Sequence, residues 1–370
     1  MPNYPNMVIH KEYTGKKYYY EEIQELKIHR SAIYVSQSKS IISRLRNYFS
    51  FVWSSYKVGL KKLEGNYDFI FCESPPLFLG ISAYFLSKKK KAKLIFNVSD
   101  LWPESAEKLG LVNNRILLGI AKMLEEFLYK KSIFITGQTQ GIVNNIIKRF
   151  PHKKVYWLPN GVDLDFFNPI NIHSNWRKEN NFSKDDILFL YAGIIGHAQG
   201  LEVILNAAYI LKSKKHLKFI LLGTGPEKDK LIKIKEELSL DQVYFIDPIS
   251  KNEMPSIISS INAAIIPLKK LDLFLGAIPS KIFETIAMKK PILLGVDGEA
   301  RQLFINEGKA GIFYNPENEK ELANGIIQLS ESKSLIESYG ENGRRFVEEK
   351  FNRNKISEDF YKELHYLSNK

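Results

Sequence analysis

Short apolar segments alternate with amphipathic segments along most of the 370-residue chain. This alternation is typical of repeated strand–helix units, which build parallel sheets. The later apolar segments end near Gly, Pro or Asp and lead into a helical pattern, as in doubly wound sheets. We therefore predict an α/β fold. The predicted strands are 67–72, 93–98, 133–137, 155–159, 187–192, 218–222, 243–246, 263–267, 292–295 and 310–314, and the predicted helices are 114–130, 200–212, 227–238, 280–288 and 319–331.

The length of the chain predicts two domains, because single hydrophobic cores stop growing at roughly 250–300 residues. A Pro- and Asn-bearing connector follows the strand predicted at 155–159 and marks the boundary. We predict a first Rossmann-like domain at 1–165, a second at 166–352, and a C-terminal helix at 353–370 that returns to the first domain. The first domain is expected to be incomplete, because its strand pattern begins late and one βαβ unit is missing from it.

The net charge of +12 lies almost entirely in the first domain. Residues 1–165 hold 25 Lys and Arg against 14 Asp and Glu, whereas residues 166–370 hold 28 against 27. Such asymmetry predicts an anionic partner for the first domain. Nucleic acid is not expected, because no helix-turn-helix, zinc-finger or RNP-type motif accompanies the charge. An anionic membrane surface is the favoured partner.

Two segments are candidates for that membrane contact. The lysine run lies at 88–93, and the segment 47–63 mixes aromatic residues with lysines in the manner of an interfacial helix. The alternative is a helix that faces the core beside a solvated lysine turn.

The cysteine count and the hydropathy of the chain limit which covalent, metal and membrane features the protein can have. The single cysteine, Cys72, excludes an internal disulfide and any metal site made of several cysteines, and we expect it to be a small buried residue. No segment approaches the about 20 consecutive apolar residues of a spanning helix. We predict a cytoplasmic protein, and we expect no metal and no cofactor.

Two glycine-bearing loops follow predicted strands of the second domain. Gly193 and Gly196 follow the strand at 187–192, and Gly223 and Gly225 follow the strand at 218–222. Glycines at such places let backbone N–H groups approach an anion at a helix N-terminus. An ordinary strand-to-helix turn is the alternative, but two such loops in one domain favour a nucleotide-binding crevice.

A third segment of the second domain combines a cation and an anion. Pro279 suits the first turn of a helix, and Lys281 and Glu284 lie three residues apart on one helical face. A diphosphate could meet Lys281, and the hydroxyls of a ribose could donate to Glu284. The alternative is an ordinary ion pair on a solvated helix.

In the first domain, Asp100 lies at the exit of the strand predicted at 93–98. A carboxylate there could act as a general base toward the hydroxyl of a substrate, or accept hydrogen bonds that orient a bound sugar. The alternative is that Asp100 or Ser105 caps the following helix.

Together these segments resemble the retaining glycosyltransferases of family 4, which have the two-domain GT-B fold. Within that family the chain is most similar to the branch of L-fucosamine transferases in bacterial surface-polysaccharide synthesis. The motifs that carry the resemblance, in chain order, are MPNYP at 1–5, ESPPL at 73–77, SDLWPES at 99–105, LPNGVD at 158–163, GHAQGL at 196–201 and PSKIFE at 279–284.

The resemblance implies a nucleotide-sugar donor, usually a UDP-sugar, bound mainly by the second domain. It implies that Glu284 binds the ribose and that Lys281 lies at the diphosphate. With Asp100, the polar group at the strand end of the first domain, these are the expected catalytic residues. Metal-independent transfer would leave positive protein groups to stabilise the leaving group. The residues expected to bind substrate are Gly193, Gly196, Gln199, Gly223, Gly225, Gly276, Ala277, Ile278, Ser280, Arg301 and Asn160.

The chain departs from the family pattern at several positions. Gly276 replaces the first glutamate of a paired motif, Ile194 and Gln199 replace an Arg and a Lys that clamp the diphosphate, and Ser99 replaces a His. The family also has a strand, a glycine-rich acceptor loop, a helix and a further strand before the MPNYP motif. We therefore expect that this N-terminal portion is missing through truncation or a late start site.

The expected activity is transfer of a sugar, such as an N-acetylamino-deoxyhexose, with retention of configuration. The acceptor would be a lipid-linked saccharide of capsule or O-antigen synthesis, at the inner face of the cytoplasmic membrane. Two alternatives remain open: a non-hydrolysing UDP-sugar epimerase with a similar architecture, and a catalytically silent scaffold subunit.

Overall fold

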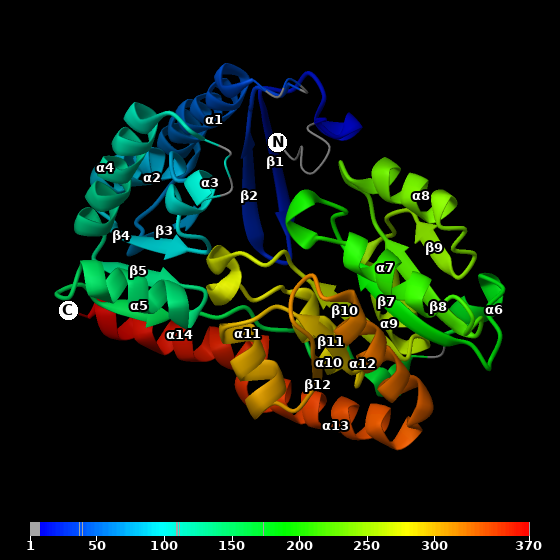
Figure 1. Ribbon diagram of the computed structural model, residues 1–370. Coiled ribbons are helices and arrows are strands. Elements are labelled where there is room, and N and C mark those ends of the chain that lie inside the picture. Colours follow the sequence, from blue (N-terminus) through cyan, green and yellow to red (C-terminus); the bar gives the residue numbers. More distant parts are fainter. Residues whose placement is uncertain are drawn as a thin grey trace. The chain divides into compact units, whose positions relative to one another are not determined.

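The computed structural model describes residues 8–36, 38, 40–108, 110, 112–172 and 174–369. The chain divides into two compact units, Met1–Leu158 and Pro159–Lys370 (Figure 1). The MPNYP motif at 1–5 lies outside the described residues. Within the described parts, no helix has both the length and the apolar content needed to cross a membrane.

The first unit begins with an antiparallel hairpin of β1 (Tyr18–Ile23) and β2 (Leu26–Ser31). Its two-residue turn, Gln24 and Glu25, has positive φ at both positions, 49° and 66°. Such a turn matches the twist of the two strands. The hairpin was not predicted, because a run with three consecutive tyrosines and no Asn-Gly or Asp-Gly turn gives little strand alternation.

A four-stranded parallel sheet forms the rest of the first unit. Its strands lie in chain order: β3 (Phe69–Ser74), β4 (Lys93–Val98), β5 (Phe134–Gly137) and β6 (Val155–Trp157). The helices of this unit are α1 (Ile41–Lys62), α2 (Leu79–Lys90), α3 (Glu104–Lys108), α4 (Arg115–Lys131) and α5 (Gln140–Arg149). The core joins strand residues such as Phe96 and Ile135 to Leu128 and Ile146 of α4 and α5. Cys72 is 3% exposed in this core, which confirms that it is a buried residue. Burial raises the pKa of its thiol to about 12.

The second unit has a six-stranded parallel sheet in the order β12-β11-β10-β7-β8-β9. This is the doubly wound order in which the chain starts at a central strand, moves to one edge, and returns to build the other half. The strands are β7 (Ile187–Ala192), β8 (Leu217–Leu222), β9 (Val243–Ile246), β10 (Ala263–Pro267), β11 (Ile292–Gly295) and β12 (Gly311–Phe313). The helices are α6 (Trp176–Glu179), α7 (Glu202–Ile210), α8 (Lys228–Glu237), α9 (Met254–Ser260), α10 (Lys281–Ala287), α11 (Glu299–Arg301), α12 (Glu319–Glu331), α13 (Lys333–Lys350) and α14 (Arg353–Ser368).

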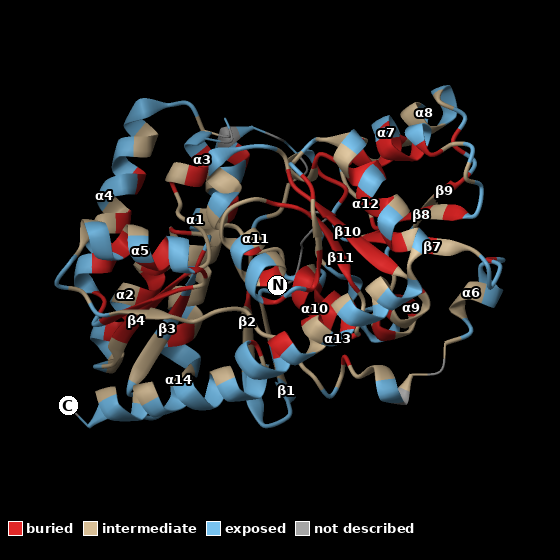
Figure 2. Ribbon diagram, turned by 60° about the horizontal axis from the view of Figure 1, so that its bottom comes forward, coloured by how far each residue is buried: buried red, intermediate tan, exposed pale blue. Residues whose placement is uncertain are grey.

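Both faces of this sheet are buried, and Figure 2 colours its central strands as buried. Alternate strand residues, such as Phe189 and Phe219, join one core with α7, α8 and α12. A separate aromatic cluster packs on α10. In it, Phe283 of α10 contacts Phe304 and Phe351 at ring-centroid distances of 5.3 and 5.0 Å. Strands buried on two faces read as continuous apolar runs. For that reason β4, β7, β10 and β11 have the bounds that the sequence predicts, and the edge strand β9 also has its predicted bounds.

Candidate functional site

The predicted site lies where the doubly wound sheet of the second unit reverses direction. β7 and β10 are neighbours, yet the chain leaves β7 toward β8 and leaves β10 toward β11. The loops after these two strands therefore separate at the carboxyl edge of the sheet. Ligands of doubly wound sheets bind at such a point. The loop after β7 carries Gly193 and Gly196, and the loop after β10 leads through Gly276 to α10.

The two glycine loops pack backbone against backbone. Gly193 and Gly223 have φ of +142° and +144°, which side-chain-bearing residues rarely adopt. A Cβ on Gly223 would lie 1.9 Å from the Gly193 carbonyl oxygen, and a Cβ on Gly225 would lie 2.2 Å from that of Ile195. The glycines of the second loop thus hold the first loop in place.

Alternate amides of the first loop remain open to a ligand. The N–H groups of Gly193 and Ile195 donate to the carbonyls of Leu222 and Thr224, both at 2.9 Å. The N–H groups of Ile194 and Gly196 donate to no acceptor among the described residues. Free amides beside a left-handed or extended glycine turn are typical of anion-binding loops.

Lys281, the first residue of α10, reaches this loop. Its ammonium nitrogen lies 2.9 Å from the position of a Cβ built on Gly193, and 3.9 Å from the ring centroid of Tyr191. Burial lowers the pKa of Lys281 to about 7, and the carboxylate of Glu284 opposes this shift. Gly193 and Lys281 lie far apart in the sequence, and the parallel pairing of β7 with β10 brings the loops after these two strands together. The alternative of an ordinary solvated ion pair does not describe this lysine.

Glu284 lies one turn further along α10 and is half-buried. Burial raises the pKa of its carboxyl group, against the attraction of Lys251, Arg353 and Lys281. Its carboxylate accepts no hydrogen bond from the residues that the structure describes. A carboxylate that is half-buried, surrounded by cations and unbonded has acceptor capacity left for hydroxyl groups of a ligand.

The other predicted residues of the second unit lie on several loops. Gly276 ends the short helical turn Asp272–Gly276, Ala277 and Ile278 follow it, and the exposed Ser280 makes no capping bond to α10. Arg301 makes two contacts, an ion pair with Asp297 at 3.4 Å and a contact with the Phe313 ring at 4.0 Å.

Two predicted residues, Gln199 and Asn160, lie on loops that follow strands β7 and β6. Gln199 closes a turn after β7, where its side-chain oxygen lies 2.9 Å from a Cβ built on Gly196. Asn160 precedes Gly161, whose backbone packs against the segment that joins α13 to α14. Arg353, the first residue of α14, is one of the cations that face Glu284.

In the first unit, Asp100 follows β4 as predicted, but its carboxylate is already bonded. Ser105, inside α3, donates its hydroxyl to Asp100 at 2.8 Å. The two residues that the sequence proposed as alternative helix caps therefore bond to each other. Asp100 remains half-buried and keeps further acceptor capacity.

Sequence reasoning missed a polar cluster at the carboxyl edge of the first sheet. The carboxylate of Glu73, at the end of β3, accepts hydrogen bonds from the Asn97 amide and the Ser99 hydroxyl. Asn97 in turn accepts from the buried hydroxyl of Thr136 on β5. Three neighbouring parallel strands carry a polar residue at their second-last position, a signal that could have been found by aligning their carboxyl ends. Ser99 thus orients a carboxylate.

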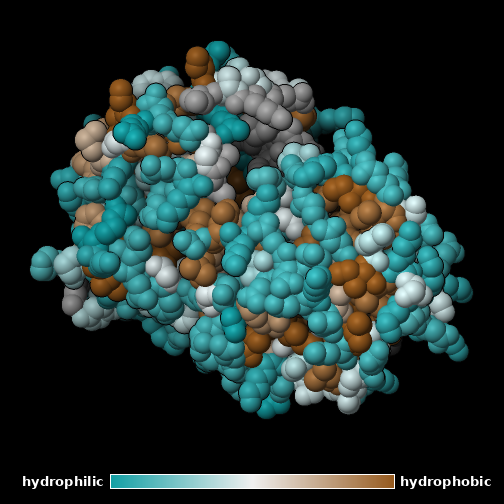
Figure 3. Space-filling view, in the orientation of Figure 1, coloured by the Kyte–Doolittle hydropathy of each residue, from teal (hydrophilic) through white to brown (hydrophobic). Residues whose placement is uncertain are grey.

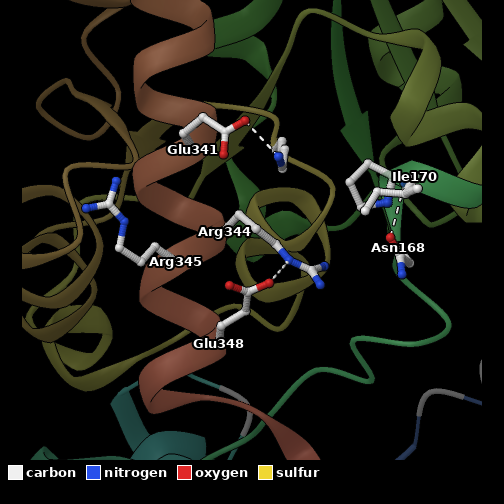
Figure 4. A pocket seen from close by; sticks show the side chains of 8 residues that line it. Asn168, Ile170, Glu341, Arg344, Arg345 and Glu348 are labelled. Carbon is white, nitrogen blue, oxygen red and sulfur yellow. Dashed lines mark hydrogen bonds and ion pairs between the residues drawn. The ribbon is translucent and has the colours of Figure 1, made fainter.

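Two cavities of the second unit lie away from these loops. One of about 260 Å³ lies beside α13, and in it Glu341 pairs with Lys289 and Glu348 with Arg344, at 2.7 and 2.5 Å (Figure 4). A second, of about 560 Å³, opens near Lys290 and the amino ends of β10 and β11. Among the described residues, no group of three or more His, Cys, Asp or Glu side chains could hold a metal ion.

The sequence of the second unit matches a known family. Residues 173–346 match the model of the family Glycosyl transferases group 1. An uncharacterised glycosyltransferase of Methanocaldococcus jannaschii is 22% identical over 69% of this chain, which spans 64% of that protein. The putative colanic acid biosynthesis glycosyl transferase WcaI of Escherichia coli is 22% identical over 98% of this chain and 89% of its own length.

A third relative acts on a lipid-linked saccharide according to its name. It is the N-acetylgalactosamine-N,N'-diacetylbacillosaminyl-diphospho-undecaprenol 4-alpha-N-acetylgalactosaminyltransferase of Campylobacter jejuni, 22% identical over 93% of this chain and 87% of its own length.

Solved structures share the fold. Sucrose-phosphate synthase from Thermosynechococcus elongatus superposes with a TM-score of 0.74 and 17% identity, covering 99% of this chain and 86% of its own. HepE of Anabaena, in complex with UDP and glucose, has a TM-score of 0.68 and 16% identity, covering 89% and 84%. Residues 173–346 therefore match a domain of the family Glycosyl transferases group 1, and the chain has the GT-B fold with two Rossmann-like domains.

Proposed function

We propose that the protein is a retaining, metal-independent glycosyltransferase that moves a sugar from a UDP-sugar to a lipid-linked saccharide in surface-polysaccharide synthesis. The observation that carries the proposal is the position of Lys281. A largely buried ammonium faces open backbone amides at the reversal point of a doubly wound sheet. A diphosphate is an anion that matches such a site in charge and hydrogen-bonding geometry.

In this proposal different residues of the second unit bind the diphosphate, the ribose and the sugar of the donor. Lys281 and the amides of Ile194 and Gly196 hold the diphosphate and stabilise the charge that develops as the sugar leaves. Glu284 accepts hydrogen bonds from the ribose hydroxyls. The backbone of Gly276–Ile278 borders the sugar. Arg301 joins only if its contact with Asp297 opens.

The first unit serves the acceptor in this proposal. Asp100 and the oriented carboxylate of Glu73 are available at its sheet edge to accept hydrogen bonds from sugar hydroxyls. The excess of basic residues in this half of the chain suits a lipid diphosphate and an anionic membrane. The name of the Campylobacter relative supports the class of acceptor. We place the protein at the inner face of the cytoplasmic membrane.

The decisive experiment compares UDP with 2′-deoxy-UDP on the wild type and on Glu284→Ala. Hydrogen bonds to a charged group contribute about 1.5–3 kcal/mol, so Glu284→Ala should weaken UDP binding about 10- to 100-fold. The wild type should prefer UDP, whereas the variant should bind the two ligands equally, because the partner of the 2′-hydroxyl is gone. Calorimetric titration measures all four affinities.

The matched control is Glu319→Ala, which removes a glutamate from the first turn of α12 in the same unit. It should bind UDP as the wild type does. Unchanged UDP affinity in Glu284→Ala would contradict the donor site and favour a scaffold protein. Interconversion of UDP-sugars with no acceptor present would point to an epimerase.

A further inference from the structure

Helix α4 of the first unit has a row of exposed apolar side chains in addition to the apolar side chains that it buries. Ile116, Ile120, Met123 and Phe127 follow each other at helical spacing, so they form one stripe along the helix. They are 75%, 50%, 65% and 38% exposed. A helix that packs on a core normally turns such a stripe inward.

The inward side of α4 carries one charged residue among its buried apolar residues. Glu125 is 3% exposed and binds Arg149 of α5 through two hydrogen bonds of 3.0 and 2.5 Å. Only Ala121, Leu128 and Tyr129 accompany it as buried residues of the helix. This ion pair helps to fix the orientation of α4. If the helix turned about its axis, Arg149 would lose the Glu125 carboxylate to which it donates.

Aromatic contacts extend the stripe onto α2. Phe127 packs against Tyr84 at a ring-centroid distance of 4.9 Å, and Tyr84 packs against Phe85 at 5.4 Å. Phe85 is itself 51% exposed. We call Ile116, Ile120, Met123, Phe127 and Phe85 the α4 face. In Figure 3, apolar side chains reach the surface among hydrophilic ones on the part of the first unit that α1, α2 and α4 form.

Cations surround this face. Lys88 lies 5.7 Å from the ring centroid of Tyr84, and Lys131 lies 5.9 Å from that of Phe127. On α4 the acidic residues are Glu125, which is buried, and Glu126, which pairs with Lys130 at 3.7 Å. The exposed cations of α2 and α4, which we call the rim, are Lys88, Lys89, Arg115, Lys122, Lys130 and Lys131.

We propose that the α4 face is the membrane-binding surface of the protein, inserted among the lipids of an anionic bilayer with its cationic rim on the headgroups. Apolar side chains in a basic rim match both layers of such a membrane, the acyl boundary and the negative surface. A second copy of the chain fits less well, because a symmetric contact through this face would bring the two positive rims together.

The inference deepens the proposed function, on which it rests for its biological purpose, since a lipid-linked acceptor lies at a membrane. It also extends the expected contact. The sequence favoured the lysine run at 88–93 and the segment 47–63, in which Phe49 and Trp53 are exposed, and the structure adds the exposed apolar stripe of α4. Attachment by this face combines insertion with charge attraction, so it should survive partly when salt screens the charges.

The test uses the full chain and vesicles of phosphatidylglycerol and phosphatidylcholine in sedimentation assays. The double variant Ile120→Gln/Met123→Gln removes two central apolar side chains without adding charge, and glutamine keeps a high helix propensity. We expect it to bind vesicles at least about tenfold more weakly than the wild type, because each lost insertion removes apolar burial. At high salt the wild type should keep measurable binding and the variant should lose it.

The control is Ile170→Gln, which removes an isoleucine of the second unit that is 79% exposed. It should bind vesicles as the wild type does. Wild-type vesicle binding by the double variant would overturn the proposal. So would a change in its oligomeric state, seen in analytical ultracentrifugation, with vesicle binding intact, since the face would then contact a second copy.

Thermal stabilisation by UDP separates this inference from the proposed function. If the double variant loses vesicle binding but keeps UDP stabilisation equal to the wild type, the α4 face is established independently of the donor site. If the wild type binds vesicles through the α4 face and UDP stabilises neither protein, the membrane surface stands and the donor assignment fails.

Discussion

Lys281 is the residue on which the donor site depends most. Its ammonium group lies over the ring of Tyr191, and burial lowers its pKa from 10.5 to about 7. In the unfolded chain a lysine keeps its proton up to about pH 10.4. The folded state therefore binds fewer protons between these two values, and stability attributable to this residue rises as the pH increases from about 7 toward 10. At lower pH the buried charge costs stability, and a bound anion would offset that cost.

This coupling predicts that UDP binding takes up a proton. Above pH 7 Lys281 is mostly neutral in the free protein, and a diphosphate restores its charge, so at pH 8 binding should take up close to one proton. Calorimetric titrations in buffers of different ionisation enthalpy measure the uptake. Lys281→Met should bind UDP weakly and with no uptake from this residue. Equal uptake in the variant and the wild type would assign the proton to another group.

At the scale of elements, close packing between helices decides which glycines can change. Gly80 of α2 lies against α4, where an added Cβ would lie 2.3 Å from a methyl carbon of Leu128. Gly119 of α4 has open space, with no atom within 4 Å of such a Cβ. The two residues occupy adjacent helices and have opposite environments, which follows from the orientation that the Glu125–Arg149 pair gives to α4.

These environments predict opposite effects of alanine. Gly119→Ala should stabilise the protein by about 1 kcal/mol, because alanine has the higher helix propensity and meets no neighbour. Gly80→Ala should destabilise it by about 1–3 kcal/mol through overpacking against Leu128. Urea unfolding followed by circular dichroism gives both values. Stabilisation by both substitutions would mean that α4 does not pack on α2 in this way.

At the scale of the whole molecule, the distribution of charge separates the two halves of the chain. The excess of positive charge falls in residues 1–165, whereas residues 166–370 are nearly neutral. A field of one sign over one half attracts an anionic surface before any contact forms. The donor site in the other half depends on single buried charges, so ionic strength should affect the two activities differently.

This difference is testable by neutralising the lysine run. Replacing Lys88–Lys91 by glutamine should weaken binding to phosphatidylglycerol vesicles, by about 1 kcal/mol for each lysine near the surface. The effect should shrink as salt rises, because exposed charges are screened over about 8–10 Å at physiological ionic strength. UDP affinity should stay constant. Vesicle binding that ignores both salt and the substitution would remove the electrostatic part of the attachment.

The sequence by itself determined the strands buried on both faces, the doubly wound class, and the segments that carry Lys281 and Glu284. Continuous apolar runs predict buried strands and glycines predict tight loops, because both depend on the burial and backbone conformation of neighbouring residues in the sequence. The β1–β2 hairpin escaped prediction, since its turn lacks the glycine that usually marks one.

Only the tertiary structure decided which distant residues meet. Strand order brings Gly193 to Lys281, and parallel strand ends bring Glu73 to Asn97 and Ser99. Helical periodicity likewise predicted α4 but not the side that faces the core. That side joins Leu128 and Tyr129 to the core and pairs Glu125 with Arg149 of another helix. Side-chain pattern specifies an element, whereas pairing across the fold specifies its neighbours, and the chemistry of this protein lies in those pairings.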